Sequence, residues 1–268
     1  MSGLTAELGG LCVAVTGGTK GIGRAAVLTL AANGARVVFQ GTDSSAGHEI
    51  ERECQKGPGE AVFVTGDLMK FEDAENLVAT ACKRFGRLDC YVSSGGPRQP
   101  PPALFRDLAT PVQSLALLES RILPRLNGLH AAVPVMKKQG GGKIILLTTD
   151  AARTPTPSES MIGAAGAVVM SLTRSLAKEL VSDGIRVNAI ATTITSGTPP
   201  YEAYLAAKAQ DSQLPLVKAF TKAHAQAGLR INTAQDLADY VLFLASPASD
   251  QITGSTMSIN GGLSFPSY

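Results

Sequence analysis

Residues 16–23 (TGGTKGIG) have the residue types and spacing that bind a pyrophosphate. Gly17, Gly21 and Gly23 allow the backbone to turn tightly and to approach phosphate oxygens closely. The helix predicted over 21–33 begins within this segment, so its free amides and the positive end of its dipole would face the anion. The segment lies between the first apolar run and the first helix of an alternating chain. That context favours a dinucleotide site over a glycine-rich connection without a ligand.

Three other polar side chains are candidates for catalysis. Thr149 and Asp150 follow the fifth predicted strand, at the edge of the sheet where ligands bind. Asp150 is interpreted as an acid or base if its surroundings tune its pKa, or as a residue that caps a turn. Thr149 is interpreted as a residue that orients a carbonyl group of the substrate, or as an ordinary threonine at the end of a strand. Arg121, on the helix predicted over 104–139, is interpreted as a group that binds a carboxylate or stabilises an enolate. The alternative is an ion pair with Glu119 or another charge of the helix.

Short apolar runs alternate with stretches of helical periodicity along the chain. The predicted strands are 11–16, 36–40, 61–65, 88–93, 143–148, 185–191 and 255–259, and the predicted helices are 21–33, 45–56, 71–85, 104–139, 160–182 and 234–245. The helix over 104–139 is expected to break near Pro124. The alternation predicts an α/β fold with a doubly wound parallel sheet of about seven strands. No linker or internal repeat interrupts it, so we expect one domain over 1–268.

Composition and charge exclude several classes of protein. Hydrophobic residues make up 44% and charged residues 17% of the 268 residues, which indicates a folded core rather than disorder. The formal net charge of +2 is spread along the chain, so neither nucleic acid nor a membrane surface is an expected partner. No apolar run is expected to span a membrane, which takes ~20 residues, and the N-terminus lacks the pattern of a secretory signal. The four cysteines lack metal-ligand spacing, so we expect free thiols, a cytoplasmic protein and no metal site.

Several segments together resemble the short-chain dehydrogenase/reductase family, over nearly all of the chain. The turn at 16–23 is similar to the family's TGxxxGIG motif. Residues 66–68 (GDL) are similar to the family's turn that contacts the adenine ring, and residues 93–96 (SSGG) stand where the family has NNAG. Residues 171–190 and 242–262 resemble its last helices and strands. The resemblance implies a single-domain NAD(P)-binding Rossmann fold, with a variable substrate lid around 195–230. It assigns these residues to the cofactor: Gly17, Thr19, Lys20, Gly21, Ile22, Gly23, Thr42, Asp67, Leu68, Ser94 and Gly95.

The second predicted strand indicates which dinucleotide is bound. An acid at its end would bind the ribose 2′-hydroxyl and select NAD, but the strand ends in Gln40 and the nearest acid is Asp43. Lys20, within the glycine turn, is placed to reach a 2′-phosphate, as in the family's NADP-preferring members, and Thr42 and Ser44 offer hydroxyl donors. We therefore predict NADP(H), with a solvated Lys20 as the alternative interpretation.

The family's active site consists of an Asn, a Ser, a Tyr and a Lys, and the resemblance implies other residues at all four positions. Without gaps, the Tyr position holds Ile162, the Lys position Gly166, the Ser position Thr149 and the Asn position Arg121. The Tyr position of the enoyl-reductase branch holds Glu159. Because the Tyr protonates the developing alkoxide and the Lys lowers its pKa, these departures imply that carbonyl reduction by the family route is lost. These departures do not by themselves remove hydride transfer, or catalysis by holding the substrate against the cofactor.

Three functions remain open. The first is an NADP(H)-dependent reductase of a small organic molecule. In it, Tyr201, Tyr204 or His224, in the lid region, replaces the missing acid, or the substrate needs no donor beyond water, as with an imine or an activated alkene. The second is a non-redox cyclase, isomerase or dehydratase on the same scaffold, and the third is a catalytically silent NADP-binding subunit. We favour the first function because the dinucleotide turn is intact.

The resemblance also implies a homo-oligomer, most simply a tetramer. The family packs its two long helices, here 104–139 and 160–182, against copies of themselves, and closed symmetric assembly is the usual outcome. The small residues predicted to form the contact face of the second helix are Gly163, Ala164, Ala167 and Met170.

Overall fold

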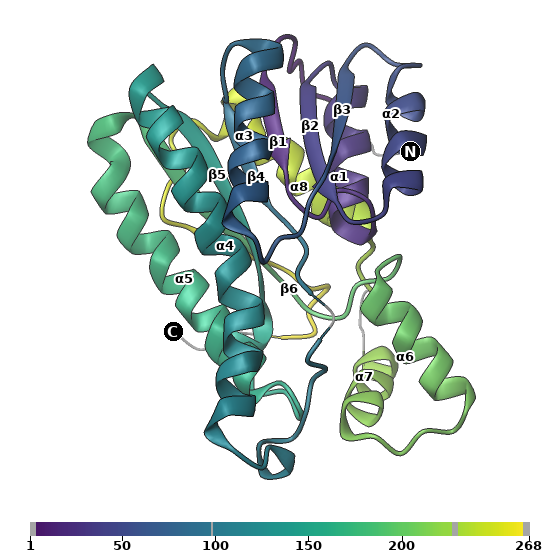
Figure 1. Cartoon of the computed structure of the whole chain (residues 1–268). Coiled ribbons are helices and arrows are strands. Elements are labelled where there is room, and N and C mark those ends of the chain that lie inside the picture. Colours follow the sequence, from purple (N-terminus) through teal and green to yellow (C-terminus); the bar gives the residue numbers. More distant parts are fainter. Residues whose placement is uncertain (1–3, 98, 227–229, 265–268) are drawn as a thin grey trace.

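The centre of the fold is a parallel sheet in the order β3-β2-β1-β4-β5-β6-β7 (Figure 1). The structure is a computed structural model and describes residues 4–97, 99–226 and 230–264. The strands are β1 (Cys12–Val15), β2 (Arg36–Gly41), β3 (Glu60–Thr65), β4 (Cys90–Ser93), β5 (Gly142–Thr149), β6 (Ile185–Thr192) and β7 (Thr256–Ile259). The predicted α/β fold with a doubly wound parallel sheet is confirmed.

Helices cover both faces of the sheet. They are α1 (Gly21–Ala32), α2 (Ser44–Cys54), α3 (Phe71–Phe85), α4 (Pro111–Gln139), α5 (Ser160–Leu180) and α8 (Ala234–Ala245), with α6 (Pro199–Ala209) and α7 (Pro215–Gln226) set apart. Alternate residues of a strand point to opposite faces. Val13 and Val15 of β1 therefore pack with α1, α2 and α8, whereas Cys12 and Ala14 face the core formed with α3, α4 and α5. Burial on both faces explains the continuous apolar runs in the sequence.

Helix α4 differs from its prediction in two ways. It begins at Pro111, a favourable first helical position, after a short 3₁₀ turn at Phe105–Asp107. It also continues unbroken through Pro124 and Pro134, so the predicted break near Pro124 is wrong. Pro124 is buried in the contact with the rest of the domain, and this packing maintains the helix although a proline removes one backbone hydrogen bond. Arg121 and Arg125 therefore lie on the same face of one continuous helix.

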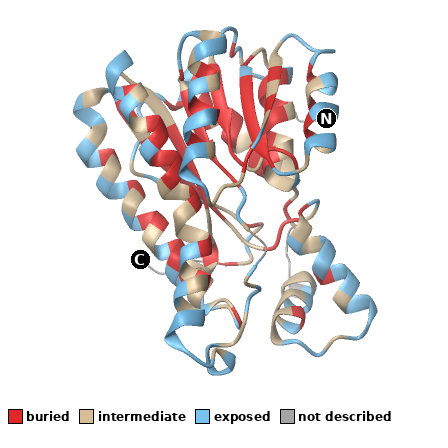
Figure 2. Ribbon diagram, in the orientation of Figure 1, coloured by how far each residue is buried: buried red, intermediate tan, exposed pale blue. Residues whose placement is uncertain are grey.

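Helix α5 corrects two expectations. By length and composition, Ser160–Asp183 is apolar enough to cross a membrane, so the expectation that no run reaches this length is wrong. In the fold, one face of α5 packs on β5 and β6, and Figure 2 shows that the rest of the helix is exposed or half-buried. The predicted small-residue contact face is also divided: Gly163 and Met170 are buried within the domain, and only Ala164 and Ala167 are exposed.

Helices α6 and α7 lie within the predicted variable region and project to one side of the sheet (Figure 1). Figure 2 shows that most of their surface is exposed or half-buried. Their contacts form a small separate core around Ile194, Tyr204 and Val217. That this unit closes over a substrate stays a prediction.

Candidate active site

The glycine turn follows β1 at the point where the sheet order reverses, between β2 and β4. Gly17 has a φ of +62°, and a Cβ atom there would lie 2.7 Å from the backbone oxygen of Ser94. A Cβ atom on Gly23 would collide with the backbone oxygen of Gly17. The amide of Gly18 donates a 2.8 Å hydrogen bond to the backbone oxygen of Gln40, which fixes the turn to β2. Gly21 also has a positive φ, +55°, so the backbone or its close contacts favour glycine at all three predicted positions.

The first turn of α1 is open to an anion. Its N-cap residue is Lys20, and among the described residues no side chain caps its amides and no acid occupies its first turn. Such amides, with the positive end of the helix dipole, form a site for phosphate groups. The fit of a pyrophosphate therefore rests on two observations, the close backbone approach allowed by the glycines and the uncapped helix end.

A cavity of about 590 Å³ adjoins this turn. Its walls come from the glycine turn and α1 on one side and from the start of α6 on the other: Thr19, Lys20, Gly21, Arg24, Gly197, Thr198, Pro199, Glu202, Ala203 and Ala206. A Cβ atom on Gly21 would lie 3.3 Å from Cδ of Pro199, so the lid region directly contacts the turn. Three residues predicted to bind the cofactor thus line one hollow with the beginning of the lid.

The corner beside β2 carries an ion pair that the sequence analysis did not predict. Lys20 Nζ lies 2.9 Å from Asp43 Oδ2, and both side chains are more than a third exposed. Asp43 also caps α2 by accepting a hydrogen bond from the amide of Ala46. The hydrogen bond from Lys20, together with that from Ala46, lowers the pKa of Asp43. Thr42 is exposed beside the pair, and Thr19 is buried against Gly41.

The turns after β3 and β4 meet the glycine turn. The Thr16 hydroxyl donates to the backbone oxygen of Ser94 at 2.9 Å and accepts from its amide at 3.0 Å. A Cβ atom on Gly95 would lie 3.0 Å from the Cα atom of Gly17. The carboxylate of Asp67 accepts a hydrogen bond from the amide of the second residue after it, and the Leu68 backbone oxygen accepts one from a side chain of α4. The residues predicted to bind the adenine side of the cofactor, at Asp67 and Leu68, thus lie beside those predicted for the ribose side, at Ser94 and Gly95. Ile22 is half-buried on the first turn of α1.

Asp150 is almost completely buried, with 1% of its surface exposed, and both carboxylate oxygens are occupied. Oδ1 accepts hydrogen bonds from Arg153 and Ser258, and Oδ2 from Asn260 and Ser264, all at 2.8 Å. Burial raises the pKa of this carboxyl group, but the four hydrogen bonds outweigh burial and hold the pKa below its usual value. Asp150 therefore holds a proton poorly at neutral pH and connects the end of β5 to the C-terminal segment.

Thr149 and Gly166 lie in direct contact. The Thr149 hydroxyl accepts a 3.1 Å hydrogen bond from the amide of Ala151, and its methyl group faces α5. A Cβ atom on Gly166 would lie 2.8 Å from Thr149 Cγ2 and 3.0 Å from Ala152 Cβ. The position therefore has no room for a side chain unless this turn moves. Ile162, one turn earlier on α5, is half-buried.

Two arginines of α4 lie at the ends of β4 and β5. Arg121 donates to the backbone oxygens of Pro97 and Pro100, not to Glu119 as the alternative interpretation had it. Arg125, which the sequence analysis missed, donates to the backbone oxygen of Gly95 at 2.8 Å and to that of a β5 residue at 3.1 Å. Burial lowers the pKa of Arg125 to about 10 and also lowers that of Arg121. The spacing of four residues on one helix was the signal that could have revealed the pair.

The polar side chains of the lid region contact one another. Tyr201 Oη lies 3.2 Å from His224 Nε2, and Tyr204 Oη lies 3.3 Å from the Thr221 hydroxyl. Both tyrosine rings stack on His224 with centroid distances of 5.7 Å. Tyr204 is buried, so its hydroxyl belongs to the core of this unit rather than to the edge of the sheet.

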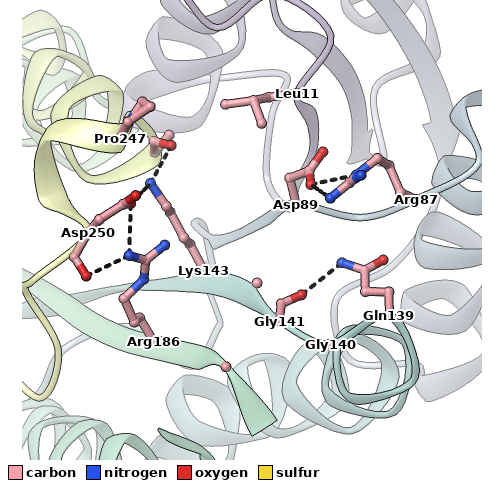
Figure 3. A pocket seen from close by; sticks show the side chains of 13 residues that line it. Leu11, Arg87, Asp89, Gln139, Gly140, Gly141, Lys143, Arg186, Pro247 and Asp250 are labelled. Atoms are coloured by element: carbon pink, nitrogen blue, oxygen red, sulfur yellow. Dashed lines mark hydrogen bonds and ion pairs between the residues drawn. The ribbon is translucent and has the colours of Figure 1, made fainter.

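A second cavity, of about 310 Å³, lies at the opposite, amino-terminal end of the strands (Figure 3). Its charged groups are mutually paired: Lys143 Nζ lies 3.0 Å from Asp250, Arg186 lies 2.8 Å from the same carboxylate, and Arg87 pairs with Asp89. These pairs hold the loops at this end together. The cavity is distant from the glycine turn, and we assign it no part in the site.

Comparison with known proteins agrees with this geometry. Residues 17–264 match the family model described as Enoyl-(Acyl carrier protein) reductase. An uncharacterized oxidoreductase of Thermotoga maritima is 31% identical over 94% of this chain and 97% of its own length. A 3-oxoacyl-[acyl-carrier-protein] reductase of Synechocystis is 30% identical over 98% of this chain and 99% of its own.

Solved structures give the same result. The crystal structure of levodione reductase superimposes with a TM-score of 0.84 at 25% identity, covering 95% of this chain and 97% of that one. A short-chain dehydrogenase/reductase family protein superimposes with a TM-score of 0.76 at 33% identity, covering 96% and 98%. The chain belongs to the short-chain dehydrogenase/reductase family. This is a family of oxidoreductases that use NAD(P)(H) and act on small molecules.

Proposed function

We propose that this protein is an NADP(H)-dependent oxidoreductase that acts on a small organic molecule through a non-standard active site. The observation that carries the proposal is the glycine turn, in which Gly17 and Gly23 leave no room for a side chain beside an uncapped helix end. A turn of this form lets the backbone and the free amides of the helix approach phosphate oxygens closely, which supports binding of a pyrophosphate.

The chain's own residues fit the cofactor in a defined order. The glycine turn and the first amides of α1 hold the pyrophosphate, the turns at Asp67 and Ser94 hold the adenine and ribose side, and Lys20 binds the 2′-phosphate. Asp43 would compete with that phosphate for Lys20, and an acid this close to the end of β2 is the main argument for NAD(H) instead. When bound, the cofactor supplies or accepts a hydride.

The proposed active site uses Arg121, Thr149 and Asp150 in different ways. Arg121 provides a positive charge near the ends of β4 and β5, where it stabilises negative charge on the substrate. Thr149 offers a hydroxyl group at the end of β5. The hydrogen bonds of Asp150 favour a positioning role, in which it holds the turn that carries Thr149. Ile162 and Gly166 stand where the family's Tyr and Lys are expected, which makes the site non-standard.

Cofactor titration and turnover test the proposal separately. Calorimetric titration with NADPH and NADH should show binding of both, with NADPH the tighter ligand. Consumption of NADPH with a panel of ketones and aldehydes then tests the reaction. Arg121→Ala should lower turnover by about 10²-fold while the dissociation constant for NADPH stays unchanged, because Arg121 lies outside the glycine turn. The absence of any binding of either nucleotide would refute the proposal.

A non-redox catalyst on this scaffold is the second candidate. The specific observation that favours it is the close contact of Gly166 with Thr149, which excludes the family's Lys from this position. Product formation with bound but unconsumed NADPH would identify a cyclase, isomerase or dehydratase. Binding without product from any substrate would identify a silent subunit.

We also propose a homotetramer, a cytoplasmic location and one domain whose segment 195–230 is the substrate lid. The contact between Pro199 and the glycine turn supports the lid, since closure of this segment would cover the pyrophosphate. The exposed outer faces of α4 and α5 in Figure 2 support the assembly.

A further inference from the structure

Two arginines of α4 meet the carboxyl ends of β4 and β5, the edge of the sheet at which ligands bind in such folds. Arg121 and Arg125 are four residues apart, so they share a face of the helix and their Cβ atoms lie about 6 Å apart. Arg121 holds the loop after β4 through the backbone oxygens of two prolines, and Arg125 holds it through that of Gly95, at 2.8 Å. A second bond of Arg125, to the backbone oxygen of Leu147 at 3.1 Å, fixes it to β5.

The contact between Arg125 and Gly95 adjoins the proposed cofactor site. A Cβ atom on Gly95 would lie 3.0 Å from the Cα atom of Gly17, in the glycine turn. The next residue, Gly96, has a φ outside the left-handed region, so its backbone does not require glycine. A Cβ atom on Gly96 would lie 3.5 Å from Nη1 of Arg125. Glycine at this position therefore leaves the guanidinium group uncovered, and its bond to Gly95 is exposed to solvent.

The two guanidinium groups have no acid as a fixed partner. Among the described residues, neither forms an ion pair, and Asp150 at the end of β5 is paired with Arg153. Glu159 acts on Arg121 from beyond ion-pair distance, and burial raises the pKa of that carboxyl group to about 7, so it is only partly charged at neutral pH. Burial lowers the pKa of Arg125 to about 10, and the charge of Arg121 acts in the same direction. The pair is therefore an uncompensated positive charge.

Both groups also keep N–H donors that the protein does not use. Arg125 donates once from each terminal nitrogen, and its buried Nε has no hydrogen-bond partner among the described residues. Arg121 donates only to neutral oxygens, those of two backbone carbonyl groups and the hydroxyl of Ser120. A charge taken out of water is costly unless an opposite charge accompanies it. Guanidinium groups bind carboxylates through paired hydrogen bonds, so a carboxylate is the ligand that this arrangement fits.

We infer that Arg121 and Arg125 together bind a carboxylate of the substrate, which makes the substrate an oxo acid; the inference rests on the proposed reductase function. The phosphates of the cofactor are assigned to the glycine turn and Lys20, so the anion left for this pair belongs to the substrate. The hydride of NADPH forms a C–H bond at the carbonyl carbon, and a proton from water forms an O–H bond at the carbonyl oxygen. The carboxylate is unchanged, and the products are a hydroxy acid and NADP⁺.

The test compares oxo acids with their methyl esters, which keep the carbonyl group but lack the charge. NADPH oxidation is measured with pyruvate, acetoacetate and levulinate and with the methyl ester of each. For the best pair, the wild-type kcat/KM should be about 10- to 100-fold higher for the acid, as expected for hydrogen bonds between charged groups. In Arg121→Gln and Arg125→Gln this ratio should fall towards one. Arg125→Lys should keep part of the preference, because it retains the charge without the fork of donors.

A matched control and a second measurement separate substrate binding from a structural role. Arg52→Gln, which changes an exposed arginine of α2, should keep the wild-type ratio. Calorimetric titration of both α4 variants should give an unchanged dissociation constant for NADPH. Weaker NADPH binding with an unchanged ratio would show that the pair binds a cofactor phosphate, and the inference would be wrong.

Two further outcomes distinguish this inference from the proposed function. Equal kcat/KM of the wild type for acids and esters, or an equal loss with both in the α4 variants, would overturn the inference and leave the reductase function standing. In the second case the arginines would only hold the loop after β4. If the wild type oxidises NADPH with none of these compounds, the reductase function fails, and the inference fails with it.

Discussion

The ion pair between Lys20 and Asp43 makes the choice of cofactor testable with two substitutions. Lys20→Ala removes the cation that we assign to the 2′-phosphate but keeps the negative charge of Asp43. Asp43→Asn removes the competing negative charge but keeps the helix cap, because Asn caps helices about as well as Asp. The two variants should therefore change NADP(H) affinity in opposite directions.

The size of the expected change in NADPH affinity follows from the solvent exposure of the Lys20–Asp43 pair. A hydrogen bond to a charged group contributes about 1.5–3 kcal/mol, and the lower value applies here because Lys20 is 53% exposed and water screens its charge. Lys20→Ala should thus weaken NADPH binding by about tenfold. NADH lacks the 2′-phosphate, so its affinity should change little. Asp43→Asn should tighten NADPH binding by a smaller factor, since it frees Lys20 without adding a contact.

Calorimetric titration of wild type and both variants with NADPH and NADH, at low and high ionic strength, measures these differences. The preference for NADPH should shrink as salt rises, because the deciding contact is exposed. Equal or reversed wild-type affinities would refute the assignment of Lys20. A loss of NADH binding in Asp43→Asn, with no gain for NADPH, would show that Asp43 binds the ribose hydroxyls and that the protein uses NAD(H).

Three further predictions concern stability and assembly. Gly166→Ala should lower the free energy of unfolding by about 1–3 kcal/mol in denaturant titration, because its Cβ would meet Thr149 Cγ2 at 2.8 Å. Gly57→Ala, where the nearest atom to the added Cβ is 3.6 Å away, should have little effect. Equal losses of stability in the two variants would contradict the packing argument. Asp150→Asn should cost about 3–5 kcal/mol at neutral pH. Because the folded pKa of Asp150 is lowered, the stabilisation is complete above its unfolded pKa of about 4 and is lost as pH falls through the lower, folded pKa. The difference between wild type and variant should therefore narrow in acid, and a constant difference would show that the charge is unimportant. Light scattering at micromolar concentration should give a tetramer, and a monomer would refute the proposed assembly.

The fold could be predicted from the sequence because each element follows from local signals. The range predicted for α3, 71–85, matches its bounds, since amphipathic periodicity and Gly86 at its end both act locally. The break predicted near Pro124 is wrong because burial of that residue depends on other elements, which local reasoning does not include.

The site was only partly predictable for the same reason. The glycine turn is contiguous in sequence, so its spacing carries the signal. The pair of Lys20 and Asp43 joins residues 23 positions apart, and the hydrogen bonds of Arg125 join α4 to the ends of β4 and β5. Neither contact has a sequence pattern, and both depend on how the strands bring distant segments to one edge.

The buried carboxylate of Asp150 also affects the order in which the chain can fold. Its partners Ser258, Asn260 and Ser264 lie 108 to 114 residues later in the chain. During synthesis, the first five strands can pair before those residues leave the ribosome, but Asp150 then stays without most of its hydrogen bonds. A charge without partners resists burial, so the turn after β5 should stay hydrated until residues 258–264 fold against it. The turn after β5 therefore reaches its final structure only after residues 258–264 have been made.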